Sequence, residues 1–109
     1  MIDIIIQPDA ANDILEAAKW YDNNLKGLGE SFLESVDYAI NSIQQNPEAY
    51  PKVYKELRRI LLKKFPFSLF YIYEDEQIIV IAVFHVVEIQ KPGRIELNNF
   101  VPNQMHNFC

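Results

Sequence analysis

The N-terminal half of the chain has the pattern of one strand followed by two amphipathic helices. Residues 1–7 are mostly apolar and β-branched, which is typical of a strand. From Pro8 onward, apolar residues recur at helical spacing and predict a helix over 8–23. Two glycines in LKGLGE then allow a tight reversal, and the same spacing predicts a second helix over 28–45. Because only a short glycine-containing connection separates the helices, we expect an antiparallel hairpin with one apolar side.

The C-terminal half contains three segments rich in β-branched and aromatic residues. We expect a strand within 53–64 that begins near Glu56, a second over 67–73 and a third over 78–87, with a polar turn over 74–77. The third segment is apolar on both faces, which predicts a central strand. Together the two halves predict an α+β fold, a two-layer β-α-α-β-β-β domain in which the helical hairpin packs on a mainly antiparallel sheet.

Length, hydropathy and cysteine content narrow the class of protein. The 109 residues suffice for one domain, which we expect to span 1–96, followed by a flexible C-terminal tail over 97–109. The longest apolar run is roughly half of the ~20 residues that a membrane span needs, and the N-terminus lacks the features of a secretory signal. We therefore expect a cytoplasmic protein with no membrane segment. The single cysteine, Cys109, permits no internal disulfide. The sequence has no metal-binding or cofactor-binding motif, so we expect no metal and no cofactor.

Charge is distributed unevenly along the chain. The net charge of −5 argues against a general nucleic-acid binder. Between residues 52 and 64, however, Glu56 is the single acid among six cations, which are Lys52, Lys55, Arg58, Arg59, Lys63 and Lys64. Two interpretations are open: these charges keep an exposed strand soluble and protect its edge, or they form a surface that faces a partner.

Three side chains of the second half carry chemistry that a site could use. His85 ends an apolar strand and could act as a general acid or base, although a lone histidine at a strand end is more often a structural hydrogen-bonding residue. Tyr71 and Tyr73 are two residues apart on one strand and therefore face the same side. They could contact a ligand, or they could pack beneath the helical hairpin.

Four segments resemble one known family in their order and spacing. They are EAAKWYDNN at 16–24, GLGESFLESVDYAINSIQQNPEAYP at 27–51, LRRILLKKFPFSLFYIYED at 57–75 and IIVIAVFH at 78–85. The combination resembles the ParE/RelE superfamily of toxins from bacterial type II toxin-antitoxin systems, also called plasmid stabilisation proteins, and is closer to the ParE-like branch. The resemblance implies a toxin that inhibits growth and is held inactive by a cognate antitoxin.

The resemblance also implies two modes of action. ParE-like members poison DNA gyrase, whereas RelE-like members cleave mRNA on the ribosome with basic side chains over the sheet and a C-terminal tyrosine. Here Ser68 and Glu88 stand where the resemblance would place arginines, and no tyrosine follows Tyr73. Since RNA cleavage passes through a phosphorane whose extra negative charge needs cations, we expect this chemistry to be degraded. We therefore expect binding to DNA gyrase; the alternatives are a ribosome-dependent mRNA interferase and a detoxified relative that only binds its antitoxin.

These expectations lead to two sets of candidate residues. The surface that binds the target or the antitoxin is expected to include Lys52, Lys55, Arg58, Arg59, Lys63, Lys64, Tyr71 and Tyr73. If the chain does cut RNA, its catalytic groups would come from His85, Lys63 and Arg59. The identity of the antitoxin and the existence of a homodimer are left open by the sequence.

Overall fold

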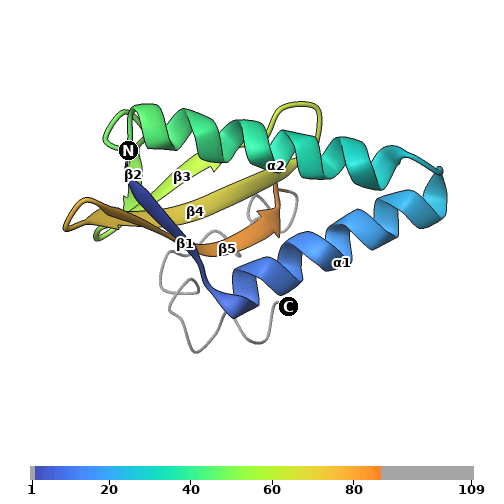
Figure 1. Ribbon diagram of the computed structural model, residues 1–109, viewed down its shortest axis with the longest axis horizontal. Helices are drawn as coiled ribbons and strands as arrows, with labels where there is room; N and C mark the ends of the chain where they lie inside the picture. Colours follow the sequence, from blue (N-terminus) through green and yellow to red (C-terminus); the bar gives the residue numbers. More distant parts are fainter. Residues whose placement is uncertain (1, 87–109) are drawn as a thin grey trace.

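The chain folds into two layers, a helical hairpin over one face of a five-stranded sheet (Figure 1). The computed structural model describes residues 2–86. The elements in chain order are β1 (Asp3–Ile6), α1 (Pro8–Asn24), α2 (Leu28–Gln45), β2 (Lys52–Tyr54), β3 (Leu57–Leu61), β4 (Phe67–Glu74) and β5 (Gln77–His85). The strand order is β1-β5-β4-β3-β2, with β1 parallel to β5 and every other pair antiparallel. The predicted α+β class and the mainly antiparallel sheet are confirmed.

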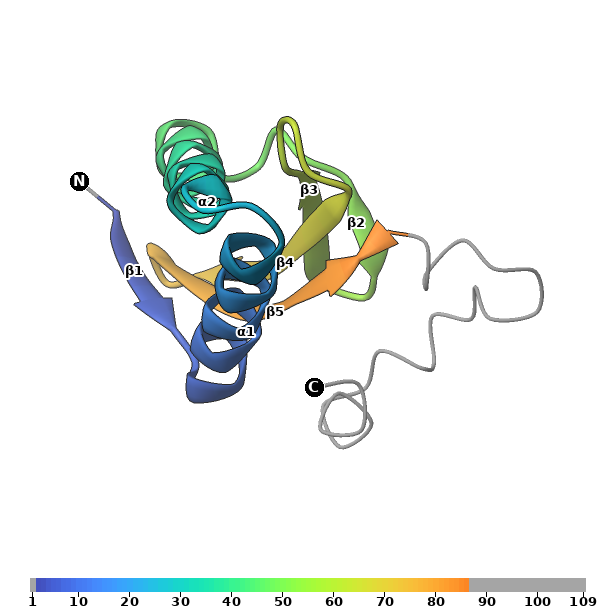
Figure 2. The same cartoon turned by 90° about the vertical axis from the view of Figure 1, so that its right-hand side faces the viewer.

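The two helices agree closely with the periodicity of the sequence. α2 has the predicted bounds, and α1 ends one residue later than expected. Both helices lie on the same side of the sheet, and the closed end of the hairpin projects past the strands (Figures 1 and 2). Neither described helix is long and apolar enough to cross a membrane.

The sheet has one strand more than expected. The strand that was expected to begin near Glu56 is β3, and β2 precedes it as an unpredicted short edge strand. A tight turn joins them, in which Lys55 has a left-handed backbone with φ 49°. β5 is an interior strand as predicted, but β4 is the middle one. The predicted end of the last strand at 87 and the predicted tail over 97–109 lie outside the described residues.

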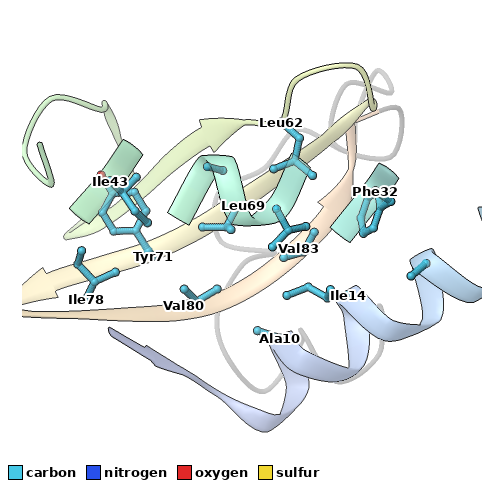
Figure 3. Packing of buried hydrophobic residues seen from close by; sticks show 13 residues of the cluster. Ala10, Ile14, Phe32, Ile43, Leu62, Leu69, Tyr71, Ile78, Val80 and Val83 are labelled. Atoms are coloured by element: carbon cyan, nitrogen blue, oxygen red, sulfur yellow. The ribbon is translucent and has the colours of Figure 1, made fainter. Parts of the chain in front are cut away.

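The main core lies between the hairpin and the sheet (Figure 3). α1 contributes small or β-branched side chains at steps of four, namely Ala10, Ile14 and Ala18, all of them buried. The helices approach each other closely at Gly29, where an added Cβ would lie 2.6 Å from the backbone oxygen of Ala18. This contact requires glycine at that position, because the backbone oxygen has little freedom to move away.

A second apolar cluster lies on the other face of the sheet. Its buried members are Leu57, Phe70, Ala82 and Phe84. Because β4 and β5 bury side chains on both faces, their sequences are nearly continuous in apolar residues instead of alternating.

Candidate partner-binding surface

The structure divides the six predicted cations between the two ends of β3 and the strand itself. Lys52 lies on β2 and Lys55 in the turn that follows it, at one end of β3. Lys63 and Lys64 follow the other end, in the loop over 62–66 that leads to β4. A strand of five residues is roughly 16 Å long, so the basic stretch is not one compact patch.

At the β2 end, the basic side chains are engaged within the chain. Lys52 Nζ lies 3.2 Å from Glu56 Oε1, and Lys55 Nζ lies 5.3 Å from the centre of the Tyr54 ring. Arg58 Nη1 donates hydrogen bonds to the backbone oxygens of Glu48 at 3.1 Å and Tyr50 at 2.7 Å. The guanidinium of Arg58 therefore holds the loop between α2 and β2 in place.

At the other end, the loop over 62–66 is fastened to α2. The hydroxyl of Ser35, which is buried, donates a hydrogen bond of 2.6 Å to the backbone oxygen of Lys63. The ammonium of Lys63 lies 3.1 Å from the hydroxyl oxygen of Tyr38 and 4.4 Å from the centre of its ring. Lys64 has a left-handed backbone with φ 73°, and within the described part of the chain its side chain makes no ion pair or hydrogen bond.

A groove of about 610 Å³ lies between α2 and this loop. It is lined by Tyr21, Leu28, Ser31, Glu34, Ser35, Tyr38, Lys63, Lys64, Phe65 and Pro66. The ring centres of Tyr21 and Phe65 are 4.8 Å apart in an edge-to-face contact, and both rings also pack on Phe32. Burial raises the pKa of Tyr21. The groove therefore combines aromatic walls with two exposed ammonium groups.

The two predicted tyrosines belong to the packing of the main core. Tyr71 is fully buried, and its hydroxyl donates a hydrogen bond of 2.7 Å to the backbone oxygen of Pro47. Burial raises the pKa of Tyr71 to about 12, an effect that the positive charge of Arg58 opposes. Tyr73 is half-buried and packs against the same cluster. A partner on the surface cannot reach the Tyr71 ring in this conformation, so we leave Tyr71 out of the proposed surface.

The three candidate catalytic residues point to different parts of the molecule. Arg59 is paired with Phe70 and so lies on the sheet face opposite the helices. Lys63 rests on Tyr38 of α2. The ring of His85 packs edge-on against Phe67, with centres 5.1 Å apart, at the end of the sheet. The fold does not bring these three side chains together.

Ser68 is a fully buried residue of β4. It has 0% exposure, it is paired with Leu61 on one side and Phe84 on the other, and its hydroxyl has no hydrogen-bond partner among the described residues. An arginine at this position would have to displace the surrounding apolar side chains. Glu88, the second position where the resemblance would place an arginine, lies outside the described residues.

The groove and its residues on α2 were not predicted from the sequence. One signal for them was present, because Ser35 is a polar residue within the apolar stripe of α2 formed by Phe32, Val36 and Ala39. A buried hydroxyl needs a hydrogen-bond partner, which here is a backbone oxygen 28 residues further along the chain.

Two solved structures of toxin-antitoxin systems share this fold. One is described as the chromosomal ParDE TA system from P. aeruginosa; the match has a TM-score of 0.60 and 17% sequence identity, covering 79% of this chain and 97% of that one. The other is the intact E. coli RelBE toxin-antitoxin complex, with a TM-score of 0.57, 15% identity and coverage of 76% of this chain and 94% of that one. At these identities the likeness shows the fold alone.

The family is shown by the sequence itself. Residues 4–89 match the model of the ParE toxin of type II toxin-antitoxin systems, parDE. The chain therefore belongs to the ParE toxin family. In the comparison with curated protein sequences, none matches this chain.

Proposed function

We propose that this chain is the toxin of a two-protein module, that a cognate antitoxin neutralises it in the cytoplasm, and that it acts by binding DNA gyrase. Membership of the ParE family supports the toxin and its pairing with an antitoxin. The structural neighbours support the same pairing, because one comes from a ParDE system and the other is a toxin-antitoxin complex.

The observation that carries the choice of binding over cutting is the dispersal of the candidate catalytic groups. Arg59 lies on one face of the sheet, whereas Lys63 contacts a helix on the other face. Ser68 occupies its position as a buried hydroxyl among apolar neighbours. Stabilising a phosphorane requires donors and cations that converge on one point, and losing one such group typically slows a reaction by ~10²–10⁴. This arrangement favours a toxin that works by occupying a surface of its target.

The proposed contact residues, for the target or the antitoxin, are the exposed cations on β3 and at its two ends. Lys52, Lys55, Lys63 and Lys64 are exposed, and Arg59 is half-exposed. The whole chain carries a net charge of −5, so an acidic partner is repelled by most of the molecule and attracted near these residues.

Induction of the chain in bacteria without its antitoxin tests the proposal. We expect growth arrest accompanied by DNA damage signalling, and recovery when the antitoxin is expressed with the toxin. Vigorous growth at confirmed expression would contradict a toxic function. If antitoxin binding persisted in that case, the chain would be a detoxified relative.

The alternative mode of action is separated by timing and by the state of mRNA. A gyrase-directed toxin leaves transcripts intact within the first minutes, because its effect arises through DNA breaks. Cleaved transcripts and halted translation within minutes of induction would instead identify an mRNA interferase.

A further inference from the structure

We propose that the closed end of the helical hairpin, residues 19–27, contacts the target of this toxin and fits an apolar pocket with carboxylates at its rim. We call these residues the hairpin tip, and the side chains that make the contact are Lys19, Trp20, Leu25 and Lys26. The proposal rests on the proposed function for the identity of the target, DNA gyrase, and on the hairpin tip itself for the chemistry of the contact.

The hairpin tip carries the two most exposed large apolar side chains of the described residues. Trp20, near the end of α1, has 61% exposure, and Leu25, which directly follows α1, has 63%. The indole ring packs edge-on against Tyr21, with centres 5.2 Å apart, and its N–H makes no hydrogen bond with any described residue. An exposed tryptophan offers a partner a large apolar area and one free donor, which is why tryptophan is enriched among the residues that dominate binding.

The hairpin tip can enter a concave surface because it stands away from the rest of the fold. It extends past the strands at one end of the molecule, and in Figure 2 the connection between α1 and α2 faces the viewer. A projecting element of this kind suits a pocket on a larger protein, where its side chains would lose their contact with water.

The charges of the hairpin tip favour a partner with carboxylates. Within residues 2–86, Lys19 and Lys26 are the cations that lie outside the basic stretch over 52–64. Both are exposed, and neither makes an ion pair with another described residue. Asp22 is the one acid of the tip, so the tip has a charge of +1 on a chain whose net charge is −5. Two lysines match one or two carboxylates, whereas a nucleic-acid backbone would need a longer row of cations.

Hydrogen bonds within the chain hold the hairpin tip in one shape before any partner binds. Oδ1 of Asp22 accepts hydrogen bonds from the backbone N–H groups of Gly27 at 2.9 Å and Gly29 at 3.2 Å. Gly27 has a left-handed backbone with φ 95°, which glycine adopts without strain. The side-chain amide of Asn24 donates a hydrogen bond of 2.7 Å to the backbone oxygen of Trp20. Preorganisation of this kind lowers the entropy lost on binding.

A double variant, Trp20→Ala with Leu25→Ser, tests the apolar contact with the purified chain and purified DNA gyrase. We expect it to bind immobilised gyrase at least roughly tenfold more weakly than the unmodified chain, and to need correspondingly more protein for half-inhibition of supercoiling. Trp20→Phe, which keeps an aromatic ring, should lose clearly less. The matched control is Leu15→Ser, at a position of α1 with 54% exposure outside the hairpin tip, and it should bind gyrase as the unmodified chain does.

A second double variant, Lys19→Glu with Lys26→Glu, tests the charges. We expect it to bind gyrase roughly tenfold more weakly at low ionic strength, with a difference from the unmodified chain that shrinks as salt is added. Because two of the variants lack the fluorescence of Trp20, urea unfolding followed by circular dichroism confirms that each variant is folded.

The outcomes separate this proposal from the proposed function. If the unmodified chain does not bind gyrase, the proposed target is wrong, and the contact with it is wrong too. If it binds, and both double variants bind within twofold of it, the hairpin tip is not the contact while gyrase stands as the target. A loss as large in Leu15→Ser would also overturn the proposal. So would unchanged gyrase binding together with weaker self-association or weaker antitoxin binding, which would assign the hairpin tip to a second copy of the chain or to the antitoxin.

Discussion

At the residue scale, two buried serines have opposite environments. Ser35 donates a hydrogen bond of 2.6 Å to a backbone oxygen. Ser68 is buried between strands that pack apolar side chains around it, and its hydroxyl has no hydrogen-bond partner within residues 2–86. A buried hydroxyl without a partner costs about 1–3 kcal/mol of stability, while a satisfied one contributes about 1 kcal/mol. The same substitution should therefore have opposite effects at the two positions.

We expect Ser68→Ala to raise the free energy of unfolding by about 1 kcal/mol, since it removes a buried hydroxyl that no described residue pairs with. Ser35→Ala should lower that free energy by about 1–2 kcal/mol, because the backbone oxygen of Lys63 loses its donor. Urea unfolding monitored by the fluorescence of Trp20 measures both changes. A loss of stability in Ser68→Ala as large as that in Ser35→Ala would mean that the Ser68 hydroxyl does find a partner.

Tyr71 links stability to pH at the alkaline end. Burial raises its pKa to about 12 in the folded chain, above the ordinary value of about 10. Folding therefore favours the protonated form of Tyr71. The contribution of this preference to the free energy of unfolding is complete below about pH 10 and is lost as the pH rises toward about 12. We expect Tyr71→Phe to be less stable near neutral pH by about 1 kcal/mol, having lost the bond to Pro47, yet to lose less stability over that alkaline range. Equal pH dependence of the two chains in urea titrations would show that Tyr71 is not responsible.

At the scale of elements, the turns carry the least regular backbone. β4 and β5 are joined by Asp75 and Glu76, whose φ angles are 53° and 59°. Both residues are left-handed, as in a two-residue type I′ hairpin turn, for which Asn-Gly is the preferred sequence. Despite these unfavourable turn residues, β4 and β5 pair from Glu74–Gln77 to Phe67–His85, with one register shift between Phe70 and Tyr71.

Replacing this turn with Asp75→Asn and Glu76→Gly should therefore stabilise the chain. We expect an increase of about 1 kcal/mol in the free energy of unfolding, because asparagine and glycine adopt left-handed conformations with less strain. Thermal and urea unfolding of the double variant provide the measurement. A decrease would indicate that the two carboxylates make contacts that outweigh the strain.

The same backbone features explain which elements could be predicted from the sequence. The helices were predicted almost to the residue, because Phe32, Val36 and the other buried positions recur at helical spacing. β2 was missed because its turn into β3 places Lys55 in a left-handed conformation without glycine or asparagine to signal it. Of the candidate surface, the cations were predicted from composition. The groove was not, because the bond from Ser35 to Lys63 joins residues far apart in the chain.

At the scale of the whole molecule, the fold separates charges that the sequence places together. At the β2 end, Lys52 forms an ion pair with Glu56, and the ammonium of Lys55 lies over the ring of Tyr54. Lys64, at the other end, makes no such contact with the described residues. The helical hairpin supplies the second wall that turns this end into a groove.

The most direct test of our central claim is a supercoiling assay with purified DNA gyrase. We expect a stoichiometric amount of the chain to inhibit supercoiling and to leave DNA breaks, and we expect prior addition of the antitoxin to prevent both effects. A parallel reaction with ribosomes and mRNA should show intact message. Undiminished supercoiling at a large excess of folded chain, together with cleaved message, would contradict the claim that this toxin acts by binding gyrase.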